Sequence, residues 1–144
     1  MTGMVMAAID LTHEDQTRRI LRKADELARG EDARLAVISV LPDFAMPLIS
    51  PWFKEGAADR AFAEAGQMLH RVIRDALGED VDARALHILR QGSVYEEVLA
   101  AAEKHSPSLI VMGAHRPDLR DYFVGPNAAH VVRHAKCSVL VLRD

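Results

Sequence analysis

The chain has a single cysteine, Cys137, so no disulfide can form within it. It has no apolar run near the roughly 20 residues that a membrane-spanning helix needs. Its 18 lysines and arginines are outnumbered by 21 aspartates and glutamates, and the net charge is −3. That charge gives no electrostatic basis for binding nucleic acid or an acidic membrane. We therefore expect neither of these partners.

Other signals are also missing. The first apolar segment is short, follows no basic region and ends at Asp10, unlike a secretory signal peptide, so we expect a cytoplasmic protein. The seven histidines lack metal-site spacing, and no metal ligands are predicted. No nucleophile elbow, Gly-x-x-x-x-Gly-Lys loop or pair of carboxylates points to catalysis. His87, His130 and His134 are accordingly predicted to be structural or solvent-facing, and no residue is predicted to be catalytic.

What the sequence does contain is the pattern of one α/β domain over residues 1–144, with 49% hydrophobic residues. Short apolar runs rich in valine and isoleucine are typical of strands buried on both faces of a parallel sheet. A run with clearer alternation favours a strand nearer an edge. The four buried strands are predicted at residues 4–9, 35–40, 109–112 and 139–142, and the edge strand at 84–89.

Amphipathic segments between these runs predict helices. The first follows Thr12, its expected cap, and ends at Gly30. The second carries an apolar face from Phe62 to Ala76, and the third begins at Ser93, three residues before Glu96, as in a capping box. The fourth spans residues 126–135. Strands alternating with helices indicate a parallel sheet with helices on both faces.

Ligands of open α/β sheets bind at the carboxyl ends of strands, where the strand order reverses. If the first strand is central, this crevice receives Asp10 from the first strand and Gly113 from the fourth. The Asp10 carboxylate could accept hydrogen bonds from a ligand. It could equally cap the helix that follows.

Two loops follow strands at the same edge. Gly113 permits close backbone approach, His115 and Arg116 supply donors, and Gly125 introduces a helix whose free N–H groups can bind an anion. The alternative is a surface loop whose charges pair with one another. The loop of residues 41–56 is long for a compact domain. It is equally consistent with a lid over a ligand and with an apolar flap or partner contact.

The sequence resembles the universal stress protein family along essentially its whole length, and most resembles the small members designated F and G. The segments that carry the resemblance are 8–12 (AIDLT), 92–93 (GS), 110–118 (IVMGAHRPD), 125–129 (GPNAA) and 131–142 (VVRHAKCSVLVL).

The resemblance implies an open five-stranded parallel sheet of order 3-2-1-4-5, related to the nucleotide α-hydrolases. It also implies a homodimer paired through the last strand, residues 138–142, and a site for ATP or another adenine nucleotide, with or without Mg²⁺. Adenine would meet Asp10 and the backbone at Val40, and ribose and phosphates would lie near Gly113 and Gly125. The nucleotide-binding residues implied are Ala8, Asp10, Val40, Met112, Gly113, His115, Arg116, Gly125, Pro126, Asn127 and Ala128.

The phosphate end departs from the pattern of ATP-binding members, Gly-x-x-Gly, nine residues, then Gly and Ser or Thr. Arg116 replaces the second glycine, the spacing to Gly125 is one residue short, and Pro126 replaces the Ser or Thr. Proline suits the first turn of a helix but removes a hydroxyl and an N–H group. Losing one such contact costs roughly 1.5–3 kcal/mol. Nucleoside recognition is therefore better supported than triphosphate recognition.

Three functional hypotheses follow. The first is a regulatory stress-response protein that binds an adenine nucleotide. The second is a nucleotide-independent dimeric protein that contacts an unknown protein partner through residues 41–56. The third is a slow ATPase, which has the least support because no general base is evident.

Overall fold

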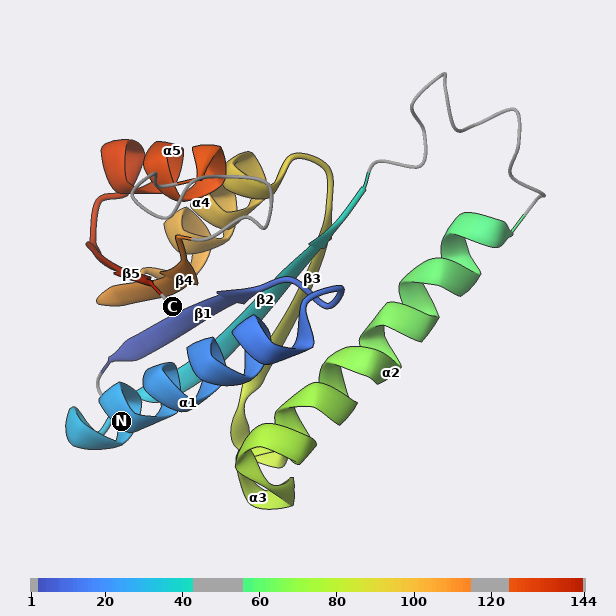
Figure 1. Cartoon of the computed structure of the whole chain (residues 1–144), viewed down its shortest axis with the longest axis horizontal. Helices are drawn as coiled ribbons and strands as arrows, with labels where there is room; N and C mark the ends of the chain where they lie inside the picture. Colours follow the sequence, from blue (N-terminus) through green and yellow to red (C-terminus); the bar gives the residue numbers. More distant parts are fainter. Residues whose placement is uncertain (1–2, 43–55, 115–124, 144) are drawn as a thin grey trace.

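The computed structural model describes residues 3–42, 56–114 and 125–143. All strand pairs are parallel, and the five strands lie in the order β3-β2-β1-β4-β5 (Figure 1). This confirms the predicted fold class and sheet order. The elements along the chain are β1 (Met4–Ile9), α1 (Glu14–Gly30), β2 (Arg34–Leu41), α2 (Ala57–Leu77), α3 (Glu79–Arg84), β3 (Leu86–Gln91), α4 (Val94–His105), β4 (Leu109–Gly113), α5 (Pro126–His134) and β5 (Ser138–Leu142).

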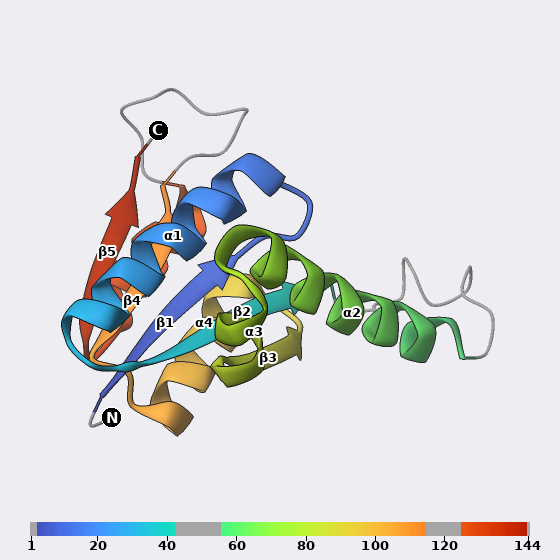
Figure 2. The ribbon, with the colours of Figure 1, turned by 90° about the horizontal axis from the view of Figure 1, so that it is seen from below.

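The sheet separates two apolar cores because alternate side chains of each strand point to opposite faces. On one face, Val5 and Ala7 of β1 pack with the apolar stripes of α1 and α2, including Leu21 and Ile73. On the other face, Met6 and Ala8 of β1 pack with α4 and α5. Figures 1 and 2 show α1, α2 and α3 on one side of the sheet and α4 and α5 on the other. β1 is buried from both sides, as its continuous apolar run predicts.

Four local predictions need correction. β5 is an edge strand and only half-buried, although its apolar run predicts burial on both faces. The cap of α1 is His13 and not Thr12, whereas the helix does end at Gly30, as predicted. Ser93 does precede α4, but its side chain makes no capping hydrogen bond. Residues 84 and 85 do not begin β3, because the short helix α3 extends to Arg84. The sequence pattern did not predict this helix, which has only two buried residues, Val81 and Asp82.

The amino-terminal part of α2 extends away from the sheet (Figures 1 and 2). As a result, Phe62 is 38% exposed, although its position on the apolar stripe predicts burial. Further along the same stripe, Leu69 and Ile73 are fully buried. No helix within the described ranges combines the length and hydropathy needed to cross a bilayer.

Candidate functional site

A pocket of about 440 Å³ opens where the sheet order reverses, at the carboxyl ends of β1, β2 and β4. This volume is within the range of about 300–1,000 Å³ typical of small-molecule sites. The walls also include the first turns of α4 and α5. Of the residues predicted for the site, those that line the pocket are Ala8, Asp10, Val40, Met112, Gly113, Gly125, Asn127 and Ala128.

The remaining predicted residues lie elsewhere. Pro126 occupies the first position of α5, beside two residues of the wall. His115 and Arg116 lie outside the described residues, as do residues 43–55 of the predicted lid or flap. Leu41 and Pro42, where that loop begins, line the pocket.

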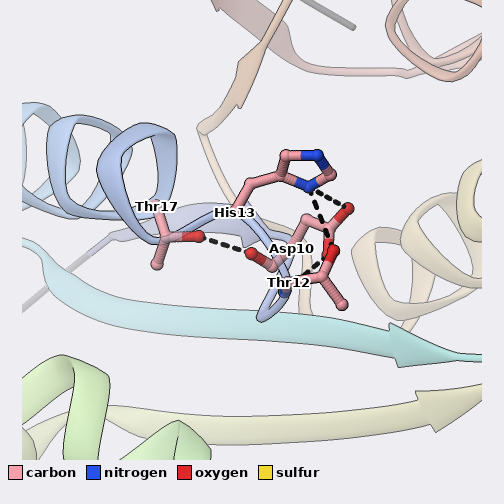
Figure 3. Close-up of polar contacts among 4 residues, drawn as sticks. All are labelled: Asp10, Thr12, His13 and Thr17. Atoms are coloured by element: carbon pink, nitrogen blue, oxygen red, sulfur yellow. Dashed lines mark hydrogen bonds and ion pairs between the residues drawn. The ribbon is translucent and has the colours of Figure 1, made fainter. Parts of the chain in front are cut away.

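Asp10 is held in a tight turn directly after β1 (Figure 3). Its Oδ1 accepts hydrogen bonds from the backbone N–H of Thr12 at 2.9 Å and from the Thr12 hydroxyl at 2.6 Å. Its Oδ2 lies 3.0 Å from Nδ1 of His13. The carboxylate therefore fixes the turn that leads into α1, and it does so through contacts within four residues of sequence.

The backbone of Asp10 is anchored from inside the helix. The buried Thr17 hydroxyl donates to the Asp10 carbonyl at 2.7 Å (Figure 3), and the His13 N–H donates to the same carbonyl at 3.1 Å. Partial burial raises the pKa of the Asp10 carboxyl, but the hydrogen bonds from Thr12 and His13 lower it by more, so the net shift is downward. Asp10 is therefore ionised at neutral pH, which suits an acceptor for ligand N–H or O–H groups and makes it a weak general base.

The pocket behind Asp10 has apolar walls. Ile38 and Val40 of β2, Val98 of α4 and Met112 of β4 line it. Ile38, Val98 and Met112 are buried. Val94 and Val98 were not predicted as site residues, although their spacing of four places them on one face of α4 at its beginning. The walls suit a flat, largely apolar group with polar edges.

Gly113 lies against a neighbour that the sequence did not indicate. A Cβ atom on Gly113 would lie 2.7 Å from Cδ of Gln16 and closer still to its amide nitrogen. Gln16 belongs to the first turn of α1 and lines the pocket. The close approach predicted between the Gly113 backbone and a ligand is thus already used, in this structure, by the Gln16 amide.

The beginning of α5 forms the other end of the pocket. The Gly125 N–H donates to the Ala114 carbonyl at 2.9 Å, and Pro126 has no N–H. The first helical hydrogen bond runs from the Ala129 N–H to the Gly125 carbonyl. This leaves the N–H groups of Asn127 and Ala128 without a partner inside the helix, at its electropositive end.

Comparisons with known proteins agree with this architecture. Residues 1–143 match the sequence profile described as the Universal stress protein family. Universal stress protein G of Shigella flexneri is 28% identical over 149 aligned positions, which cover 99% of this chain and all of that protein.

Solved structures share the fold. A universal stress protein from Archaeoglobus fulgidus in complex with dAMP superposes with a TM-score of 0.63 and 20% identity, covering 99% of this chain and 98% of that one. A universal stress protein in complex with cAMP gives 0.68 and 17% identity, covering 98% and 97%. The sheet order, the pocket at its switch point and the profile match over nearly the whole length together show that this chain belongs to the Universal stress protein family.

Proposed function

We propose that this chain is a regulatory stress-response protein that binds an adenine nucleotide in the pocket between β1 and β4. The observation that carries the proposal is one pocket that has an ionised acceptor, Asp10, at one end and, at the other, N–H groups of α5 without a partner inside the helix. The side chains that line the rest of the pocket are largely apolar. A nucleotide has the matching order of groups: a flat base with donor edges, then a sugar, then an anion.

The two ends differ in strength, and this favours a nucleotide with few phosphates. At the base end, Oδ2 of Asp10 can accept a further hydrogen bond beside its contact with His13, because the Asp10 side chain is about half exposed. At the phosphate end, Gly125 N–H is engaged and Pro126 contributes none. Two of the structural neighbours were solved with dAMP and cAMP, which each have one phosphate. We therefore propose AMP or a similar monophosphate as the better ligand, with no requirement for Mg²⁺.

Binding rather than catalysis fits the pocket chemistry. The hydrogen bonds that lower the pKa of Asp10 also make it poor at removing a proton from water near neutral pH. If ATP is hydrolysed, we expect the rate to be no faster in this chain than in its Asp10→Asn variant.

The test is calorimetric titration of the purified protein with AMP, ATP and GMP, with and without Mg²⁺, after mass analysis of any ligand released on denaturation. Asp10→Asn should weaken AMP binding by about 10- to 100-fold, because a hydrogen bond to a charged group contributes about 1.5–3 kcal/mol. Asp15→Asn is the matched control, since the Asp15 side chain is 92% exposed. Equal affinity for AMP and GMP, equal AMP affinity in both variants, or no binding of any adenine nucleotide would contradict the proposal.

A second variant tests the weakness of the phosphate end. Pro126→Ser supplies one N–H group and one hydroxyl at the first turn of α5. We expect it to raise the affinity for AMP and ATP by about tenfold or more and to leave the affinity for adenosine unchanged. A parallel change in adenosine affinity would mean that α5 does not face the phosphates.

Dimerisation through β5 is a second proposal, carried by the edge position of this strand. Among the described strands, β5 pairs with β4 alone, and Val139–Leu142 are half-buried in the single chain. An open apolar edge invites pairing with another strand, and the second copy of this chain offers an identical one. Sedimentation should give twice the 15.9 kDa of the chain, with and without AMP. A monomer at micromolar concentration would contradict this, and a dimer with no nucleotide affinity would favour the nucleotide-independent function.

A further inference from the structure

Two histidines and a buried aspartate converge at the amino end of β3, away from the nucleotide pocket. His70 belongs to α2, Asp82 to α3, and His87 to β3. His87 Nε2 lies 2.7 Å from Oδ1 of Asp82, and His70 Nδ1 lies 3.0 Å from Oδ2. The imidazole rings stack with their centroids 3.9 Å apart, at an angle of 26°. One ring nitrogen from each histidine is thereby directed at the same carboxylate.

Two members of the cluster are largely buried, and the third is exposed to solvent. The side chain of Asp82 is 8% exposed and that of His87 19%, whereas that of His70 is 50% exposed. Burial raises the pKa of the Asp82 carboxyl, but the hydrogen bonds from both histidines lower it by more. The carboxylate is therefore ionised at neutral pH, with water able to reach the site from beside His70.

We propose that His70, Asp82 and His87 form a binding site for a divalent transition-metal ion of the Zn²⁺ class. The ligand atoms would be Nδ1 of His70, Nε2 of His87 and a carboxylate oxygen of Asp82. All three lie within 4.8 Å of one another. In a tetrahedral zinc site with bonds of about 2.0–2.1 Å, ligand atoms are about 3.3 Å apart. The two nitrogen–oxygen contacts, 2.7 and 3.0 Å, are a few tenths of an ångström shorter than this. To bind one ion, these contacts would lengthen and the two stacked rings would tilt so that both nitrogens face it, with water as the fourth ligand.

The donor set determines the class of ion. Imidazole nitrogens suit Zn²⁺, Co²⁺, Ni²⁺ and Cu²⁺, whereas Mg²⁺ and Ca²⁺ prefer sites made of oxygen atoms. The ion would take the place of the two ring protons that now face the carboxylate. Each neutral ring would then carry its proton on its other nitrogen, so metal binding to neutral histidines releases no net proton.

Chain spacing does not reveal this group. His70 and Asp82 are 12 residues apart, and Asp82 and His87 five apart. Neither spacing is that of a paired-histidine or cysteine motif, which explains why the sequence predicts no metal ligands. The folding of α2 and α3 against β3 brings the three side chains together. The proposal does not depend on the nucleotide site, which lies at the carboxyl ends of the strands, whereas this cluster lies at the amino end of β3.

The test is calorimetric titration of chelator-stripped, dialysed protein with ZnCl₂, together with the visible spectrum after addition of CoCl₂. We expect one Zn²⁺ per chain and the intense bands of low-coordinate Co²⁺. His70→Ala should weaken Zn²⁺ binding by more than about 100-fold, since loss of a mere outer-sphere partner already costs about 10- to 100-fold. Zn²⁺ should also raise the melting temperature of the unaltered chain and not that of His70→Ala.

The control is the double variant His130→Ala/His134→Ala, which removes the histidines spaced by four on α5. It should bind Zn²⁺ as the unaltered chain does. His70 is the preferred position to change because it is half exposed on a helix surface, and melting in chelator will verify that the variant folds. The proposal is overturned if Zn²⁺ affinity survives in His70→Ala, if it is lost in the α5 double variant, or if the unaltered chain does not bind Zn²⁺ and the cluster is a hydrogen-bonded network only.

Discussion

Two aspartates of this protein each contact histidine, one at the carboxyl ends of the strands and the other at the amino ends. They differ in where their partners lie in the sequence and in how far they are buried. Asp10 follows β1 at the carboxyl edge, and its partners are Thr12 and His13. Asp82 precedes β3 at the amino edge, and its partners come from α2 and β3. The Asp10 side chain is 55% exposed, and the Asp82 side chain is 8% exposed.

The difference separates a carboxylate with local partners, which an organic ligand can reach, from one that joins distant elements of the fold. A ligand entering the pocket can compete for Asp10 without unfolding anything, because its partners are local and its side chain meets solvent. The buried carboxylate of Asp82 contacts two imidazole rings in place of water. Removing it would leave those ring N–H groups without their acceptor among packed elements. We expect substitutions at the two positions to affect different properties.

The largest expected effect is on stability. In the presence of a chelator, Asp82→Ala should lower the free energy of unfolding by about 3 kcal/mol, since it removes two hydrogen bonds to a buried charged group. Asp10→Ala should lower it by only about 1 kcal/mol, the usual cost of an exposed turn or cap contact. Urea denaturation monitored by circular dichroism measures both. Equal losses at the two positions would break the distinction between them.

Acid should sharpen the same comparison. The pKa of Asp82 is below its ordinary value of 3.8 in the folded state, so the unfolded chain binds more protons. The stabilisation by Asp82 is therefore complete above the ordinary value and is lost as the pH falls through the lower, folded one. The difference in unfolding free energy between the unaltered chain and Asp82→Asn should shrink as the pH falls below about 4.

Asp10 provides the internal comparison for acid unfolding. Its pKa is also lowered, so the sign is the same, but its exposure to solvent weakens the contribution. The difference between the unaltered chain and Asp10→Asn should decline over the same range with a smaller amplitude. A difference for Asp82→Asn that grows as the pH falls below about 4 would show that its carboxyl is not ionised in the folded state.

The two clusters also explain what the sequence could and could not predict. Asp10 was predicted as a site residue because the end of a buried strand is visible as the end of an apolar run, and parallel strand ends share one edge. The sheet order and the pocket position followed from the family resemblance and the strand-helix alternation. None of that reasoning requires knowledge of side chains from distant elements.

Asp82, in contrast, depends on such knowledge. Its segment, Glu79–Arg84, is short and charged, with no apolar stripe that predicts a helix. Burial of its carboxylate results from the positions of α2 and β3, which only the fold determines. Gln16 was missed for the same reason, because its proximity to Gly113 joins the start of α1 to the end of β4.

The smallest expected effect tests whether the carboxyl edge also depends on such a distant contact. Gly113→Ala places a methyl group against the Gln16 amide, which is the flexible end of a long side chain and can move aside. We therefore expect a loss of less than about 1 kcal/mol in unfolding free energy, and no loss when Gln16→Ala is also present. The double-mutant cycle by urea denaturation measures this coupling.

If Gly113→Ala costs several kcal/mol even without the Gln16 side chain, then backbone packing of β4 requires the glycine. The carboxyl ends of the strands would then depend on tertiary contacts as much as the Asp82 cluster does. If the loss disappears, glycine is needed there only to make room for a movable amide, which a bound nucleotide could displace.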